Sequence, residues 1–146
     1  MGKDIGFLPG TMEDKMMPWI APIRDNLKYL MGNDKGILDS YISQGIIEIE
    51  ALTYIRGRSI PNAFIIIDEA QNLSIHELKT IITRVGEGTK IVLTGDIEQI
   101  DNVYVDEVSN GLTCAVEKFK EYDLSGHVTL TKGERSSVAT LAAKIL

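Results

Sequence analysis

The stretch that most constrains the fold of this chain is residues 64–72, which read FIIIDEAQN. Four apolar residues run directly into two adjacent carboxylates, Asp68 and Glu69. A short, uninterrupted apolar run is typical of a strand that is buried on both faces of a parallel sheet. Neighbouring carboxylates repel each other unless water or a cation relieves the repulsion. The stretch therefore predicts a buried strand whose carboxyl end is solvated or faces a cation.

The rest of the chain alternates helices with strands, which predicts βαβ units and a parallel sheet within one domain spanning residues 1–146. We expect a helix over 11–31 in two pieces, because Pro18 and Pro22 interrupt it. Ser74, with Glu77 three residues later, predicts a capped helix start. Further helices are expected at 37–43, 75–85, 109–122 and 136–146, and further strands at 46–52, 91–94 and 128–130.

Composition and charge exclude several classes of protein. The chain has 146 residues, of which 44% are hydrophobic and 25% charged, as in an ordinary globular domain. No apolar run approaches the roughly 18 residues of a membrane span, and no apolar leader follows Met1, so we expect no membrane partner. Cys114 is the only cysteine, which favours a reducing cytoplasm. The net charge of −6 gives no general attraction to nucleic acid, although it leaves open a local basic loop or a basic ring channel.

Polar clusters follow three of the expected strands. In a parallel sheet, ligands lie beyond the carboxyl ends of the strands, so these clusters would meet at one edge. The clusters are Asp68 and Glu69 with Gln71, Gly95 and Asp96 with Gln99, and residues 131–135.

The hydrolysis of a nucleoside triphosphate needs side chains of these types. One carboxylate helps to hold Mg²⁺, usually through water, because this ion keeps much of its hydration shell. A second carboxylate polarises the attacking water. Neutral amides sense the γ-phosphate by hydrogen bonding, and an arginine stabilises the charge that develops during phosphoryl transfer. The clusters therefore favour an ATPase.

The ordered motifs of the chain resemble those of one family. DEAQ at 68–71 is similar to the Walker B box of superfamily-one helicases, and LTGDIEQ at 93–99 to their third motif. The set GFLPG, YIRGRSIPNAFIIIDEAQN, IITRVGEGTKIVLTGDIEQID, SNGLT and VTLTKGERS resembles the PhoH family of P-loop ATPases over nearly the whole chain. This resemblance implies an α/β fold with a helix-flanked parallel sheet and a P-loop NTPase core of the RecA or helicase type. It also implies ATP, Mg²⁺, a homo-oligomeric ring and, for some members, RNA unwinding.

The resemblance implies catalytic roles for three residues. Asp68 would serve the magnesium ion, through water, and Glu69 would serve the hydrolytic water. Arg135 would reach phosphate, in its own site or in that of a neighbouring subunit. The alternative for Arg135 is a simple ion pair with Glu134.

Further residues would contact the nucleotide. Two glutamines would touch or sense the γ-phosphate, a glycine and an aspartate would form the sensor turn, and two arginines lie in the RGR loop. For the two arginines and for Gln71, the alternative is an ordinary solvated position. These residues are Gln71, Gln99, Gly95, Asp96, Arg56 and Arg58.

One motif of the family is absent. The phosphate-binding loop, Gly-x-x-x-x-Gly-Lys-Ser/Thr, should precede GFLPG, but the only Gly-Lys pair is Gly2-Lys3. Its backbone amides and lysine hold the β- and γ-phosphates. We therefore expect the chain to be the C-terminal part of such an ATPase, with a core incomplete on its N-terminal side and half of the active site. The alternative is a fold-and-assembly module without hydrolysis. An RNA-binding protein without nucleotide chemistry is weaker, because aromatics make up only 6% of the chain.

Overall fold

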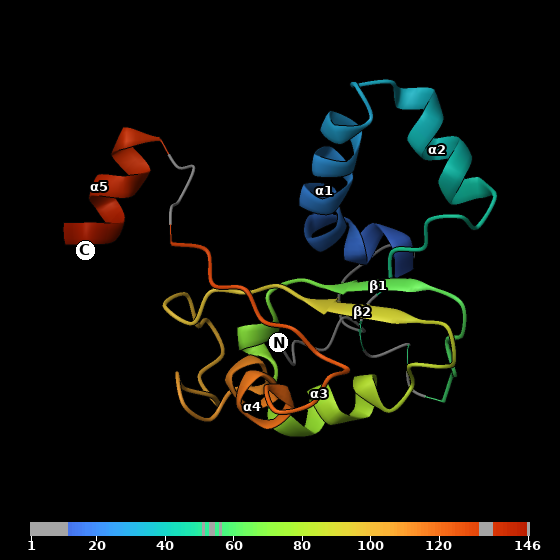
Figure 1. Ribbon diagram of the computed structural model, residues 1–146. Helices are drawn as coiled ribbons and strands as arrows, with labels where there is room; N and C mark the ends of the chain where they lie inside the picture. Colours follow the sequence, from blue (N-terminus) through green and yellow to red (C-terminus); the bar gives the residue numbers. More distant parts are fainter. Residues whose placement is uncertain (1–11, 51, 53–54, 56, 132–135, 146) are drawn as a thin grey trace.

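A computed structural model describes residues 12–50, 52, 55, 57–131 and 136–145. Figure 1 shows α3 and α4 together on one side of a small sheet, with α1 and α2 on the other side and α5 apart from both. The elements are α1 (Met12–Leu30), α2 (Lys35–Ser43), β1 (Phe64–Ile67), the 3₁₀ helix η3 (Ala70–Asn72), α3 (Ile75–Ile82), β2 (Lys90–Leu93), α4 (Gly111–Phe119) and α5 (Ser137–Ile145).

The sheet consists of β1 and β2, which run parallel, with Phe64 opposite Lys90 and Ile67 opposite Leu93. The ladder continues past the strands, because Thr94 N donates to Ile67 O at 2.9 Å and Ala70 N donates to Thr94 O at 2.9 Å. Parallel neighbours need a crossover connection, and α3 supplies it. The predicted βαβ unit and α/β fold are confirmed, and the carboxyl ends of both strands lie side by side.

Helix α3 begins at the predicted capping box. Glu77 N donates to the Ser74 hydroxyl at 3.2 Å, and Ser74 N donates to the Glu77 carboxylate at 2.9 Å. Such a cap stabilises a helix by about 1 kcal/mol. The helix ends at Ile82, three residues before the expected end.

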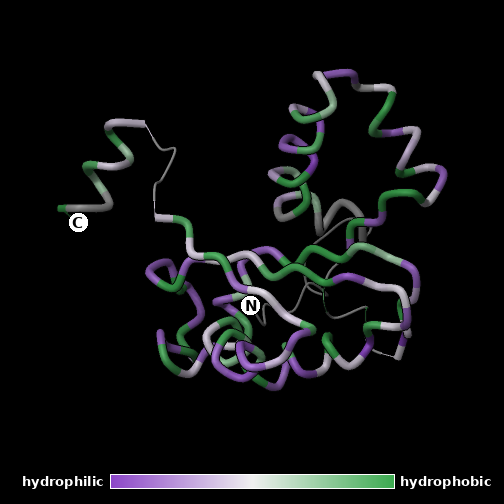
Figure 2. The backbone as a smooth tube through the Cα atoms, viewed as in Figure 1, coloured by the Kyte–Doolittle hydropathy of each residue, from purple (hydrophilic) through white to green (hydrophobic). Residues whose placement is uncertain are grey.

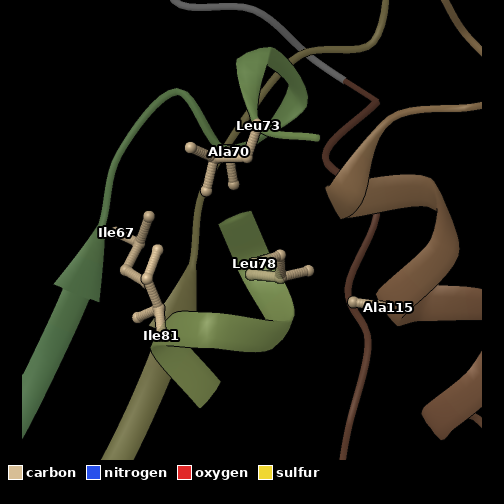
Figure 3. Packing of buried hydrophobic residues seen from close by; sticks show 6 residues of the cluster. All are labelled: Ile67, Ala70, Leu73, Leu78, Ile81 and Ala115. Atoms are coloured by element: carbon tan, nitrogen blue, oxygen red, sulfur yellow. The ribbon is translucent and has the colours of Figure 1, made fainter. Parts of the chain in front are cut away.

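The core lies between the sheet, η3, α3 and α4. Figure 3 shows Ile67 of β1 pointing toward Ile81 of α3, while Ala115 of α4 faces α3. This packing anchors the segment that follows β1, because that segment contributes two of the cluster's members. The buried cluster is Ile67, Ala70, Leu73, Leu78, Ile81 and Ala115.

The expectation that β1 is buried on both faces is wrong. Phe64 and Ile66 are 63% and 64% exposed, whereas Ile65 and Ile67 pack against the core. The reason is that the described sheet has only two strands, and the buried cluster joins its Ile65 and Ile67 side to α3 and α4. Figure 2 shows both strands as apolar stretches between hydrophilic loops.

Two expected strands do not form. Residues 46–50 are bends and irregular backbone, and residues 128–130 have no assigned secondary structure. Val128 and Leu130 are 79% and 87% exposed. A strand needs a hydrogen-bonded neighbour for its backbone groups, and within the described residues β1 and β2 pair only with each other. Residues 132–135, which make up most of the third predicted cluster, lie outside the described residues.

The N-terminal helix also differs from expectation, since α1 is continuous from Met12 to Leu30 with Pro18 and Pro22 inside it. Each proline removes one backbone donor, but its fixed φ of about −65° is compatible with a helix. Arg24 of α1 pairs with Asp39 of α2 at 2.6 Å. Among the described residues, no helix combines the length and apolar character needed to cross a bilayer.

Candidate functional site

The turn after β1 has a strained backbone at Glu69. This residue has φ 55° and ψ 38°, in the left-handed region, where glycine and asparagine are common and glutamate is not. Such a conformation costs on the order of 1–3 kcal/mol and is concentrated at functional sites. Asp68 and Glu69 are both exposed. The strain therefore marks the turn that presents the two carboxylates as a candidate site.

Asp68 is held by the residue that directly follows the neighbouring strand β2. The Thr94 hydroxyl donates to Asp68 Oδ1 at 2.7 Å, and Glu69 N donates to the same oxygen at 3.1 Å. Sequence reasoning missed the role of Thr94, although a hydroxyl residue directly after the adjacent parallel strand is the signal that would have indicated it. Because both hydrogen bonds go to one oxygen, Asp68 is oriented while Oδ2 has no hydrogen bond in the described structure.

Gln71 is fully buried, with 0% of its surface exposed. Its amide nitrogen donates to Glu69 Oε2 at 2.6 Å and to the Gln99 carbonyl oxygen at 2.9 Å. Its amide oxygen accepts from Asp96 N at 3.2 Å. The family resemblance implies that Gln71 touches or senses the γ-phosphate, but in this arrangement its side chain presents no surface to a ligand. It joins the two turns of the site instead.

The turn after β2 brings Gly95, Asp96 and Gln99 beside Gln71. The Gln99 side chain donates to Asp96 Oδ2, and Glu98 N donates to Asp96 Oδ1 at 3.0 Å. Gln99 is exposed, so its side chain is accessible to a ligand, unlike that of Gln71. The structure thus brings together Asp68, Glu69, Gln71, Gly95, Asp96 and Gln99.

We predict that Gly95→Ala lowers the free energy of unfolding by about 1–3 kcal/mol, the usual effect of overpacking. A Cβ at this position would lie 2.8 Å from Leu112 Cδ2 and 3.2 Å from Gln71 N, and closer still to the Gln71 amide oxygen. Denaturant unfolding of the 146-residue chain measures the loss. Gly126→Ala is the matched control, because nothing lies within 4 Å of its Cβ position. Equal stabilities of the two variants would contradict the close packing at Gly95.

Two further amides, which sequence reasoning missed, fasten the loop between β2 and α4. The Asn72 side-chain oxygen accepts from Asp101 N at 2.8 Å and from Asn102 N at 3.1 Å. Asn110 is fully buried and caps α4 by accepting from Thr113 N at 2.8 Å. The burial of Asn110 and the contacts of Asn72 could not be read from the sequence. This loop is therefore held against η3, next to the site.

Asp106 also stabilises this loop. The backbone N–H groups of Ser109 and Val108 donate to its carboxylate at 2.7 Å and 2.8 Å. These hydrogen bonds favour the charged form and lower the pKa of Asp106 below its usual value. The contribution of these hydrogen bonds to the stability of the fold is therefore fully present above the ordinary aspartate pKa. It is lost as the pH falls through the lowered pKa of Asp106.

The predicted arginines are not brought to these carboxylates by any described contact. Arg58 pairs instead with Glu50 at 2.9 Å and with Glu48 at 3.5 Å. Arg56 and Arg135 lie outside the described residues. No ion pair among the described residues involves Asp68 or Glu69.

The donor chemistry of the site fits Mg²⁺. Carboxylate and hydroxyl oxygens are the ligands that this ion prefers, and it commonly binds through one or two carboxylates and several waters. In the described part of the chain, no three side chains of His, Cys, Asp or Glu form a dedicated metal cage. Asp68 therefore has the type of donor that a water-bound Mg²⁺ ion needs.

Comparisons with known proteins identify one family. The model of the PhoH-like protein family matches residues 1–145. The chain is 60% identical to "Protein PhoH2" of Bacillus subtilis over all of its own length and 34% of that protein's. It is 41% identical to "Protein PhoH2" of Mycolicibacterium smegmatis over 99% of this chain and 32% of that protein. The same name belongs to a relative in Thermobispora bispora, 40% identical over 99% of this chain and 33% of that protein.

The chain thus spans about a third of the length of the curated relatives that it matches. The family match nevertheless covers nearly every residue of it, including both turns of the site. The chain belongs to the PhoH-like family of P-loop NTPases.

Proposed function

We propose that this chain supplies the magnesium-binding and water-activating carboxylates of an ATPase. The observation that carries the proposal is the paired restraint of Asp68 and Glu69. Thr94 hydrogen-bonds the first at 2.7 Å, and buried Gln71 hydrogen-bonds the second at 2.6 Å. The side chain of Glu69, the residue with the strained backbone, is exposed and is not part of the core cluster. Two exposed, oriented carboxylates at the ends of parallel strands suit chemistry on a bound ligand.

The two carboxylates would have different roles in hydrolysis. Asp68 would hold Mg²⁺ through water, and the bound ion would neutralise charge on the β- and γ-phosphates. Glu69 would accept a proton from the water that attacks the γ-phosphorus. The bond from that phosphorus to the bridging oxygen breaks as the new bond forms, and ADP and phosphate leave. Gln99, whose side chain is exposed and donates to Asp96, would sense the γ-phosphate.

The missing phosphate-binding loop limits what these residues can do alone. Without the loop, the backbone amides and lysine that hold the β- and γ-phosphates are lacking. We use the term complete ATPase for a protein that contains this segment together with such a loop. A fold-and-assembly module without hydrolysis is the second candidate, and the absence of the loop from residues 1–146 favours it.

We predict that the 146-residue chain alone releases phosphate from ATP and Mg²⁺ only at the background rate, whereas the complete ATPase turns over. The reason is the loop that residues 1–146 lack. A phosphate-release assay on both proteins measures the difference. Robust turnover by the chain alone, abolished by Glu69→Gln, would show that the site is complete without the loop. A complete protein that binds ATP and never hydrolyses it would favour the assembly module.

A further inference from the structure

We propose that Gln71 is a positioning residue that fixes the carboxylate of Glu69 and fastens it to the turn from Gly95 to Gln99. The inference rests on the proposed function of Glu69 and extends it to a second residue. It replaces the direct phosphate contact that the sequence predicts for Gln71.

Every hydrogen-bonding group of the Gln71 amide is used inside the protein. An amide has two N–H donors and an acceptor oxygen. The donors go to Glu69 Oε2 at 2.6 Å and to the Gln99 carbonyl oxygen at 2.9 Å. The oxygen accepts from Asp96 N at 3.2 Å. With 0% of its surface exposed, Gln71 has neither a polar group nor surface left for a nucleotide.

The hydrogen bond from Gln71 restrains the carboxylate of Glu69, which is the proposed general base. An exposed glutamate side chain is flexible, and ordering it during the reaction would cost conformational entropy. A hydrogen bond to a charged oxygen is stronger than one between neutral groups. Gln71 therefore fixes Oε2 in advance, while Oε1 has no hydrogen bond in the described structure and is available to a water molecule.

The same amide connects Glu69 to the second turn. Asp96 N and the Gln99 carbonyl oxygen both belong to the segment after β2. The contact is close, because a Cβ on Gly95 would lie 3.2 Å from Gln71 N and nearer to the Gln71 amide oxygen. A displacement of this turn would displace Gln71. The position of Glu69 thus depends on the turn that borders the expected γ-phosphate position.

The test compares two Gln71 variants in the complete ATPase. Gln71→Glu keeps the size of the side chain and an acceptor for Asp96 N, but it loses both donated hydrogen bonds and places a second carboxylate beside Glu69. Gln71→Leu removes all three contacts. For both variants we expect kcat to fall about 10- to 100-fold, as is typical when a residue that orients a reacting group is lost. The dissociation constant of a non-hydrolysable ATP analogue should change by less than about threefold, because positioning acts on the transition state.

Asn72→Asp is the matched control. It also replaces a neighbouring amide with a carboxylate of the same size. The Asn72 oxygen accepts from Asp101 N and Asn102 N, and no described hydrogen bond joins this side chain to Glu69. It therefore reproduces the added charge without removing a contact to the carboxylate. Its kcat should stay close to that of the unmodified protein.

An NMR measurement on the 146-residue chain tests the contact without catalysis. The Gln71 side-chain amide protons should exchange slowly with solvent, and their resonances should shift in Glu69→Ala. Rapid exchange together with unshifted resonances would overturn the inference, even if the Gln71 variants failed to fold.

The kinetic outcomes separate the two proposals. Normal kcat in both Gln71 variants, with hydrolysis lost in Glu69→Gln, overturns this inference alone. Weakened analogue binding with unchanged kcat also overturns it, because that result indicates direct contact with the nucleotide. Full activity of Glu69→Gln overturns the proposed function, and this inference with it.

Discussion

Glu69→Gln in the complete ATPase is expected to slow ATP hydrolysis by about 10²- to 10⁴-fold while ATP still binds, the usual contribution of a general base. Glutamine keeps the shape of the side chain and an oxygen that can accept from the Gln71 amide, which donates to Glu69 Oε2 at 2.6 Å. The substitution therefore removes the charge that polarises water and leaves the geometry of the turn. Single-turnover hydrolysis measures the rate, and binding of a fluorescent ATP analogue measures the affinity.

Two further variants test whether the loss of hydrolysis is specific to the carboxylate of Glu69. Glu98→Gln removes one negative charge from the exposed turn after β2, and no side-chain contact to Asp68 or Glu69 is described for it, so its rate should stay near that of the unmodified protein. Asp68→Ala should also change the dependence of the rate on Mg²⁺ concentration, because Asp68 is the proposed ligand of the ion. A Glu69→Gln rate within a few-fold of normal would remove Glu69 from the role of base.

The elements that sequence reasoning predicted correctly are those determined by local signals. The apolar run 64–67 forms β1, and Ser74 with Glu77 forms the capping box of α3. Both depend on residues within a few positions of each other. The fold class also follows from the sequence, because alternating strands and helices leave few arrangements other than a parallel sheet.

The wrong predictions concern features that depend on distant partners. Residues 46–50 and 128–130 have strand-forming sequences, but a strand also needs a hydrogen-bonded neighbour, and these segments have none in the described structure. The burial of Phe64 depends in the same way on what covers the sheet. Hydrophobic pattern predicts which residues suit a strand, and it cannot supply the strand or helix against which they pack.

Part of the candidate site could be predicted and part could not. Residue type and position after a strand indicated Asp68, Glu69 and Asp96, because exposed acidic groups at such ends suit a metal or water. The role of Gln71 depends on its complete burial among the two turns, which is a tertiary property. The left-handed backbone of Glu69 has no local signal either, since glutamate does not favour it.

Arg135→Ala in the complete ATPase is expected to lower the rate of hydrolysis by roughly 10³- to 10⁵-fold, the usual contribution of an arginine that stabilises the transferred phosphoryl group. The described site is acidic, with Asp68, Glu69 and Asp96 around the two turns, and an ATP polyanion needs compensating positive charge there. Arg58 does not supply this positive charge in the described structure, because it pairs with Glu48 and Glu50. The resemblance in residues 128–136 makes Arg135 the strongest remaining candidate.

Substitutions of different chemistry test whether the guanidinium itself is needed. Lysine keeps the charge but loses the planar fork of donors, so Arg135→Lys should fail nearly as badly as Arg135→Ala. Arg24→Ala is the control for the loss of an arginine, because Arg24 pairs with Asp39 between α1 and α2. Steady-state phosphate release measures all three variants.

Mixing subunits decides whether Arg135 acts in its own site or in that of a neighbour. One population carries Arg135→Ala and the other carries Glu69→Gln, and each alone should be nearly inactive. If Arg135 reaches across an interface, some mixed interfaces combine an intact Arg135 from one subunit with an intact Glu69 from the next. Activity should then rise above that of either variant alone. If it acts within its own subunit, every site lacks one of the two groups and mixing restores nothing. Normal hydrolysis by Arg135→Ala alone would contradict both versions and leave an ion pair with Glu134 as its role.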